Sequence, residues 1–171
     1  MDNFCEQLVE KKRTGGDKAK VAVTLGVSIL LGAAVIVFAV ASGFLLVSVC
    51  AIAMIAFGIW LATGYGVEYE YILTNNEMDI DKIKGKRNRE RMITVDISKA
   101  TAYRTLPDPD EKDADVVVYA TTGSEKNAQY LICEHSDYGV VKLIFNPDAK
   151  MREAIEQELP RSLRQKVTEN G

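Results

Sequence analysis

The chain has 171 residues, of which 47% are hydrophobic, and a formal net charge of -3 at pH 7. This length is typical of one domain, but residues 21–67 contain no Asp, Glu, Lys, Arg or His, whereas the remainder is densely charged. A single soluble globular domain is therefore excluded, because the apolar run is far longer than the ~20 residues that cross a bilayer once.

Residues 1–20 precede the apolar run and are expected to form a cytoplasmic leader. Basic residues flanking a membrane segment stay on the cytoplasmic side. In this leader they are Lys11, Lys12, Arg13, Lys18 and Lys20.

Residues 21–66 are too long for one helix and predict two transmembrane helices, at about 21–41 and 44–64. The only plausible break is Ala41-Ser42-Gly43, and a short turn is favoured because backbone in hydrocarbon must satisfy its own hydrogen bonds. The turn carries no charge, so both termini are expected in the cytoplasm. The protein is then a multi-pass protein of the cell (plasma) membrane.

An alternative is that Ala39-Val40-Ala41 is a signal-peptidase site. The segment before it is longer than a typical signal core, and a second apolar span begins at once, so we favour two retained spans. Cys5, Cys50 and Cys133 fall in three different regions, and unpaired cysteines are expected in a reducing compartment.

The spans contain small residues and interfacial aromatics. Gly26, Gly32 and Gly58 occur in small-xxx-small spacings that allow close helix packing, within one chain or between copies. Trp60 and Tyr65 lie near the end of the second span, where amphipathic rings prefer the headgroup level. Neither span contains an ionisable group, which disfavours a transporter or channel.

Residues 67–160 are expected to form a mainly-β soluble domain. The stretch VEYEYIL alternates with period two, Asn75-Asn76 forms a turn, and EMDIDKI resumes the alternation. Further alternating runs give seven predicted strands: 67–74, 77–84, 91–97, 101–106, 116–121, 128–134 and 140–145.

The period changes after the last strand. Asn146 is a suitable N-cap, with Pro147 at the first helical position. Apolar residues at Met151, Ile155 and Leu159 then form one helical stripe, and Pro160 ends the helix. Residues 161–171 are expected to be a polar tail.

Seven strands and one C-terminal helix resemble the pleckstrin-homology-like (PH-like) barrel, a seven-stranded sheet capped by a helix. The order Tyr71-Ile72-Leu73-Thr74, basic hairpin, Ile93-Thr94-Val95-Asp96-Ile97 is similar to bacterial PH-like domains tethered behind paired membrane helices. The whole chain, including Phe145-Asn146-Pro147-Asp148, resembles an uncharacterised family of small bacterial membrane proteins, a domain of unknown function. The resemblance implies a transmembrane α-helical hairpin followed by an α+β domain, and it implies no chemistry.

Catalytic and cofactor motifs are weak. Cys133 and His135 share a strand face, but zinc needs more ligands and His135 is the only histidine. An acidic loop, Pro107–Asp115, lacks the glycine and terminal glutamate of a calcium loop. We find no phosphate-binding loop. The sequence therefore predicts no enzyme, no catalytic or metal site, no cofactor and no small-molecule substrate.

One stretch, KIKGKRNRER, is strongly basic. If the strands run along the membrane normal, this hairpin tip returns towards the bilayer, where anionic lipid attracts each cation. A solvated turn is the alternative. Nucleic acid is disfavoured because no aromatics are interleaved with the cations. The candidate lipid-contact residues are Lys82, Lys84, Lys86, Arg87, Arg89 and Arg91.

Two functions remain open. In the first, a membrane-anchored PH-like domain binds a protein partner or docks weakly to anionic lipid. In the second, the chain is a structural or assembly subunit of a homo-oligomeric membrane complex.

Overall fold

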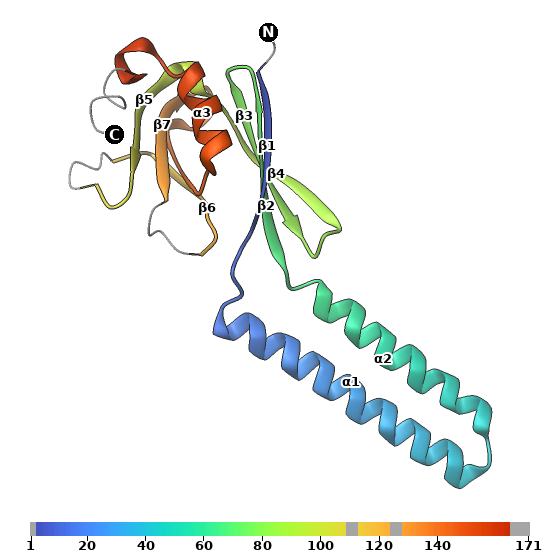
Figure 1. Ribbon diagram of the computed structural model, residues 1–171. Coiled ribbons are helices and arrows are strands. Elements are labelled where there is room, and N and C mark those ends of the chain that lie inside the picture. Colours follow the sequence, from blue (N-terminus) through green and yellow to red (C-terminus); the bar gives the residue numbers. More distant parts are fainter. Residues whose placement is uncertain (1–2, 109–112, 124–127, 165–171) are drawn as a thin grey trace. The chain divides into compact units, whose positions relative to one another are not determined.

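The chain forms two units, each assembled from segments that are distant in the sequence (Figure 1). The computed structural model describes residues 3–108, 113–123 and 128–164. The helical unit comprises Arg13–Gly66 and Lys84–Arg87. The β unit comprises Met1–Lys12, Val67–Ile83 and Asn88–Gly171.

Two helices, both long and apolar enough to cross a membrane, make up most of the helical unit. Helix α1 (Gly15–Ser42) is followed by a short 3-10 helix, η1 (Leu45–Val47), and by α2 (Ser48–Thr63). The predicted break is confirmed: Gly43 ends α1 with a positive φ of 73°, a conformation that glycine adopts without steric cost.

Helix α1 begins six residues before the predicted start because its N-terminus is capped by charged and polar side chains. The Thr14 hydroxyl accepts a hydrogen bond from Asp17 N (3.3 Å), and Asp17 Oδ2 accepts one from Thr14 N (3.1 Å). This reciprocal capping box satisfies two backbone donors. At 28 residues, α1 is about 42 Å long.

The two helices pack through small residues. A Cβ atom on Gly32 would lie 2.9 Å from Ile55 Cγ1, and one on Gly58 would lie 1.9 Å from Ser28 Oγ. Gly26 differs, because a Cβ there would meet nothing within 4 Å. Of the three glycines expected to pack helices, only Gly32 and Gly58 therefore lie in the contact between α1 and α2.

We predict that Gly58→Ala destabilises the helix pair by about 1–3 kcal/mol, because overpacking forces the backbones apart. Thermal unfolding of the detergent-solubilised protein would measure the loss. Gly26→Ala is the matched control and should leave the midpoint unchanged. Adding Ser28→Gly to Gly58→Ala removes both atoms that a Cβ on residue 58 would clash with, and should restore part of the lost stability. Equal unfolding midpoints for Gly58→Ala and Gly26→Ala would contradict a close contact between α1 and α2 at Gly58.

The first sheet of the β unit contains a strand that lies before the helices in the sequence. Its order is β1-β2-β3-β4, with β1 at Phe4–Glu10, β2 at Val67–Thr74, β3 at Glu77–Lys84 and β4 at Asn88–Asp96. Strand β1 runs antiparallel to β2, from Phe4 opposite Thr74 to Glu10 opposite Glu68. Figure 1 shows β1, in blue, beside β2.

The segment predicted as a leader, residues 1–20, therefore contains a strand of the β unit, and this unit includes residues that precede residue 67. Cys5 and Val9 are buried, while Glu6 and Glu10 are exposed, which is the alternation of a strand with one buried face. The helical hairpin is consequently an insertion between two neighbouring strands. Lys11 N donates to Val67 O at 3.0 Å directly beside the insertion.

The second sheet has the order β5-β7-β8-β6. Its strands are β5 (Ala100–Thr105), β6 (Val116–Ala120), β7 (Gln129–His135) and β8 (Gly139–Phe145), and a short 3-10 helix, η2 (Ile97–Lys99), links β4 to β5. Strand β6 pairs in parallel with β8, whereas β7 is antiparallel to both β5 and β8.

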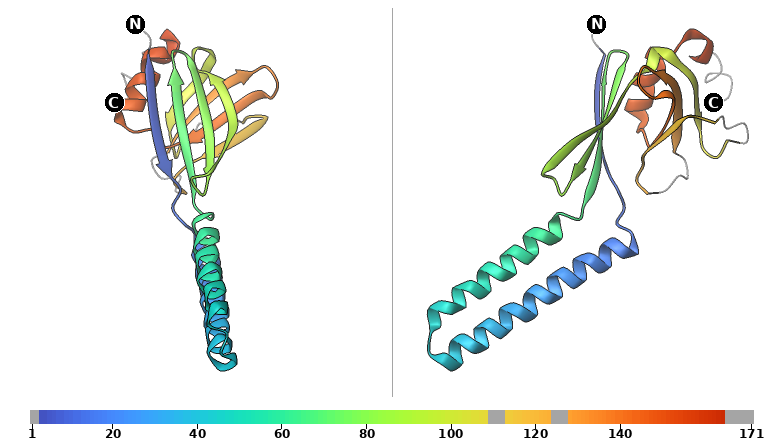
Figure 2. Two further views of the ribbon diagram at one scale, coloured as in Figure 1. Left: turned by 90° about the vertical axis from the view of Figure 1, so that its right-hand side faces the viewer. Right: turned by 180° about the vertical axis from the view of Figure 1, so that it is seen from behind.

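Eight strands in two sheets replace the predicted closed barrel of seven. Within the described residues, each sheet has four strands and the sheets do not close on each other. Figure 2 shows the two sheets as separate layers. The extra strand is β1, and the parallel pairing of β6 with β8 depends on long-range contacts that periodicity does not reveal.

Helix α3 (Ala149–Glu158) buries Met151, Ala154 and Ile155 in the core formed by both sheets. Asp148 caps it through a 2.7 Å hydrogen bond from Met151 N. The predicted cap, Asn146, instead accepts a hydrogen bond from Thr122 N at 2.9 Å. Residues 161–164 of the predicted tail form one further helical turn, and residues 165–171 lie outside the described residues.

Candidate membrane-interface site

The tip of the β3–β4 hairpin, residues 84–87, contacts the end of α2 within the helical unit. Gly85 N donates to Gly66 O at 2.7 Å. A Cβ atom on Gly85 would lie 2.7 Å from Gly64 Cα, and its φ is 60°. Glycine is required here both for the positive φ and for the close approach of the two backbones.

Arg87 caps the C-terminal end of α2. Its Nη2 donates to Trp60 O (3.0 Å) and to Thr63 Oγ1 (2.6 Å), and its guanidinium lies 4.3 Å from the Trp60 ring centroid. The last carbonyls of a helix lack intrahelical partners and carry the negative end of the dipole. The cation therefore gains hydrogen bonds, a favourable dipole interaction and a cation–π contact.

Two predicted interface aromatics lie at this end of the helical unit. Trp60 stacks against Phe57 at 5.7 Å between ring centroids, and the Tyr65 hydroxyl is 3.2 Å from Thr24 Oγ1 on α1. Both aromatic side chains are exposed to solvent. Their position at the end of an apolar helix is typical of residues at the headgroup level.

Arg89 and Arg91 belong instead to the β unit, where they neutralise buried carboxylates. Arg89 Nη2 lies 2.6 Å from Glu70 Oε2, and Arg91 Nη1 lies 2.7 Å from Asp79 Oδ1. Arg91 Nε also contacts Asp81. Glu70 and Asp81 are only 5% and 2% exposed, so the two arginines offset a large desolvation cost.

Burial dominates the acidity of Glu70. It raises the pKa of this carboxyl above its ordinary value, the Arg89 guanidinium opposes the shift, and the neighbouring Glu6 adds to it. The hydrogen bond to Asp81 raises the pKa of Arg91. Sequence reasoning missed this ion network. The acids on alternate positions of β2 and β3, followed by arginines on β4, were the available sign of cross-strand pairs.

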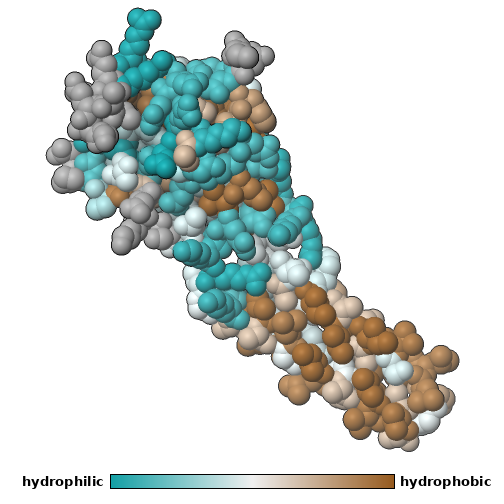
Figure 3. Space-filling view, in the orientation of Figure 1, coloured by the Kyte–Doolittle hydropathy of each residue, from teal (hydrophilic) through white to brown (hydrophobic). Residues whose placement is uncertain are grey.

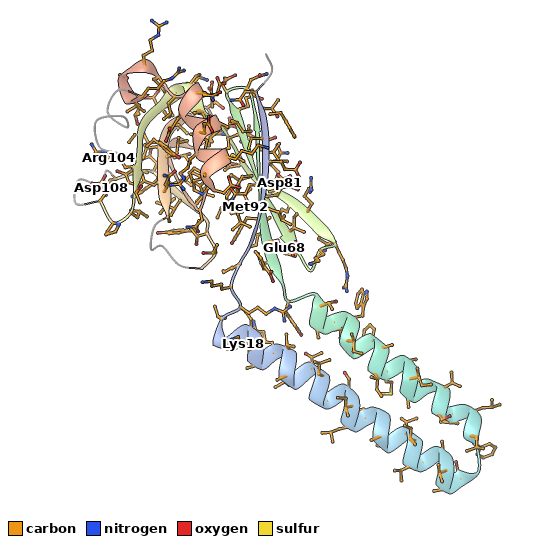
Figure 4. All side chains as sticks on the ribbon, in the orientation of Figure 1. Lys18, Glu68, Asp81, Met92, Arg104 and Asp108 are labelled. Carbon is orange, nitrogen blue, oxygen red and sulfur yellow. The ribbon has the colours of Figure 1, made fainter. Side chains whose placement is uncertain are left out.

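The six candidate lipid-contact residues therefore divide between the units. Lys84, Lys86 and Arg87 lie in the helical unit, whereas Lys82, Arg89 and Arg91 lie in the β unit. Arg13, Lys18 and Lys20 join the first group from the start of α1. All six cations of the helical unit are exposed. Figure 4 shows Lys18 at the first turns of α1.

The residues considered for catalysis or metal binding do not converge. Cys133 is buried, and burial raises the pKa of its thiol to about 11, so it stays protonated at neutral pH. His135 Nδ1 accepts a hydrogen bond from Asp137 N at 3.1 Å. No group of three or more His, Cys, Asp or Glu side chains suited to a metal occurs among the described residues.

The described part of the acidic loop forms local contacts. Asp108 Oδ2 lies 3.1 Å from Arg104 Nη1 and accepts a hydrogen bond from the Tyr130 hydroxyl at 2.6 Å. Asp115 Oδ2 accepts a hydrogen bond from Val140 N at 2.9 Å. Asp110 and Glu111 lie outside the described residues.

Two four-stranded sheets with a C-terminal helix, interrupted after the first strand by an apolar helix pair, define a mainly-β domain with a candidate membrane anchor. The chain belongs to the family described as "Bacterial PH-like domain (DUF6106)", whose model matches residues 1–165. The resemblance predicted from the sequence is confirmed. Searches of curated proteins and of solved structures found no match. Because the family match includes β1 and both helices, the inserted hairpin is part of the family architecture.

Proposed function

We propose that this chain is a non-enzymatic integral membrane protein that displays its PH-like β unit at the cytoplasmic face of the plasma membrane. There the domain binds a protein partner or docks weakly to anionic lipid. In this proposal the chain needs no cofactor, uses no small-molecule substrate and binds no nucleic acid.

The surface of the helical unit carries the proposal. Large apolar side chains are exposed along both helices, including Leu30 on α1 at 72% and Ile52 on α2 at 69%. Figure 3 colours this surface as hydrophobic, with hydrophilic residues gathered where α1 begins. An apolar surface of this extent is costly in water and favourable in hydrocarbon.

Connectivity and charge support the proposed topology. Helix α1 follows β1 and α2 precedes β2 in the chain, and these two strands pair with each other, so both ends of the inserted hairpin return to the same side of a membrane. Every charged residue of the helical unit lies at that end. Basic residues at membrane boundaries favour the cytoplasm, which supports two cytoplasmic termini.

A binding role, and not catalysis, fits the chemistry of the β unit. Its buried polar side chains Glu70 and Asp81 are engaged in ion pairs, and the thiol of Cys133 lies in the core. A nucleophile needs an exposed, activated position, which Cys133 does not have.

Membrane fractionation with reporters at both termini tests the proposal. The protein should resist extraction by alkaline carbonate, and reporters at residues 1 and 171 should both respond only to cytoplasmic probes. Release into the soluble fraction, or a terminus on the opposite side, would contradict it.

Crosslinking in native membranes separates the two candidate roles. A distinct crosslinked partner supports recruitment by the β unit. A ladder of identical subunits supports instead the alternative, a structural subunit of a homo-oligomeric complex.

A further inference from the structure

Charge is divided unequally between the two units. The helical unit carries six basic residues and one acidic residue, Asp17, whereas the β unit carries the remaining fifteen basic and twenty-three acidic residues. Asp17 is engaged with Thr14 in the capping box. A protein that is acidic overall therefore contains one strongly cationic end.

This cationic end, which we call the basic collar, is assembled by the fold. Arg13 lies just before α1, Lys18 and Lys20 lie in its first turns, and the other three members come from the β3–β4 tip, more than sixty residues later in the sequence. They are Arg13, Lys18, Lys20, Lys84, Lys86 and Arg87. The Gly85 N to Gly66 O hydrogen bond and the contacts of Arg87 with Trp60 and Thr63 attach the tip to α2.

We propose that the basic collar binds the phosphate headgroups of anionic phospholipids in the cytoplasmic leaflet. This inference rests on the proposed function, because it requires α1 and α2 to lie in a bilayer. The collar directly adjoins apolar helix surface that starts at Val21. A phospholipid presents a phosphate next to hydrocarbon, whereas a peptide, a nucleic acid or a free phosphate ion does not.

Arg87 has a specific part in this site. A guanidinium has five N–H donors, and both hydrogen bonds that fix Arg87 start at Nη2. Fixing the side chain against Trp60 lowers the entropy cost of binding a phosphate with its other donors. Trp60 itself is expected at headgroup level, so Arg87 is held at the depth of the lipid phosphates.

Arg89 and Arg91 do not belong to the collar, because they lie in the β unit, where their guanidiniums pair with Glu70, Asp79 and Asp81. The β unit has an excess of acidic residues and is repelled by an anionic surface. The collar therefore supplies the electrostatic attraction between the protein and the anionic lipid surface, at the end of the helical unit where the chain enters and leaves the membrane.

Quenching of Trp60, the only tryptophan, reports lipid directly at the site. The full-length protein would be reconstituted in phosphatidylcholine bilayers that contain either brominated phosphatidylglycerol or brominated phosphatidylcholine at equal mole fraction. The anionic lipid should quench Trp60 more strongly. Each cation of the collar should account for about fivefold in relative affinity.

Three variants test which residues are responsible. K84Q/K86Q/R87Q should lower the preference for the anionic lipid by about two orders of magnitude, leaving the part due to Arg13, Lys18 and Lys20. K18Q/K20Q changes neither Trp60 nor the contacts of Arg87, and should lower the preference even if the tip variant folds poorly. K150Q/R152Q/R161Q removes three exposed cations of the β unit and should leave the preference unchanged.

Equal quenching by the two lipids, or an unchanged preference in K18Q/K20Q, would overturn the inference. It would also be overturned if added inorganic phosphate removed the preference while chloride at the same ionic strength did not. The last outcome would assign the site to free phosphate. Failure of the proposed function looks different, because neither brominated lipid would then quench Trp60.

Discussion

A chain that begins at Val67 is expected to be insoluble or unfolded, whereas a chain in which residues 12–66 are replaced by Asn-Gly is expected to be soluble and folded. In the second chain, Lys11 and Val67 flank a two-residue loop. Asn-Gly is the preferred loop for joining adjacent antiparallel strands, and β1 and β2 are such strands.

The difference arises from β1. Its seven residues pair with β2, and it buries Cys5 and Val9, which are 2% and 6% exposed. Burying a large apolar side chain contributes about 1.5–3 kcal/mol, and losing β1 also exposes β2 as a long sheet edge. The sum approaches the ~5–15 kcal/mol that stabilises a whole domain.

Strand β1 also holds the start of α3. Gln7 Nε2 donates to Asn146 O at 3.0 Å, and Gln7 Oε1 accepts from Asp148 N at 2.9 Å. Asn3, the residue before β1, donates from Nδ2 to Ala154 O in α3 at 3.2 Å. Removing β1 therefore loosens a helix that fills the core.

Yield in the soluble fraction and cooperative thermal unfolding, followed by circular dichroism, would compare the two chains. A control chain with the Asn-Gly junction and Val9→Asp should behave like the chain that begins at Val67, because a buried unpaired charge is strongly unfavourable. Cooperative unfolding of the chain that begins at Val67, at the same temperature as the joined chain, would refute a structural role for β1.

Replacing Arg89 with methionine is expected to lower the free energy of unfolding by about 2 kcal/mol, because it leaves the buried Glu70 carboxylate without its partner. The value is at the low end for a buried pair, since the Arg89 side chain is half exposed and water can reach the vacated position. Denaturant unfolding of the soluble Asn-Gly chain measures it.

The pH dependence of this loss has a defined sign. Burial raises the pKa of Glu70 in the folded protein, so folding binds a proton between the ordinary and the raised pKa. Stability then increases as the pH falls through that window towards 4.5. Without Arg89 the pKa of Glu70 rises further. The loss in free energy of unfolding caused by Arg89→Met should therefore become smaller as the pH is lowered.

Matched variants separate the ion pair from general effects of charge removal. Glu70→Gln combined with Arg89→Met should be more stable than Arg89→Met alone, because no buried charge is left unpaired. Arg161→Met removes an exposed cation on the same unit and should change stability by less than about 0.5 kcal/mol. If Arg89→Met and Arg161→Met lower the free energy of unfolding equally, the ion pair between Arg89 and Glu70 does not stabilise the fold.

Periodicity predicted most of the elements but not the strand at the N-terminus. Residues 67–74, 77–84 and 140–145 alternate clearly, and each forms a strand at or close to the predicted bounds. Residues 4–10 also alternate, but they are short and charged and stand beside basic residues that are typical of a membrane-flanking leader. Only their pairing with β2 identifies them as a strand.

The basic stretch illustrates a second limit. Six cations within ten residues form one basic run in the sequence, yet Arg87 caps α2 while Arg89 and Arg91 pair with acids of β2 and β3. The partners lie between 8 and 27 residues away, in elements whose proximity is decided by sheet pairing and by the close approach of Gly85 to Gly64. Spacing alone could not assign them.

The sequence by itself determined the two apolar helices, the break at Gly43, the seven later strands and the C-terminal helix, because each depends on local periodicity, turn residues or the absence of charge. Tertiary structure decided that the helices interrupt a sheet between β1 and β2, that the strands form two open sheets, and which cations belong to which unit. These features depend on contacts between distant residues, and a chain gains them only when buried area and paired charges outweigh the entropy of closing long loops.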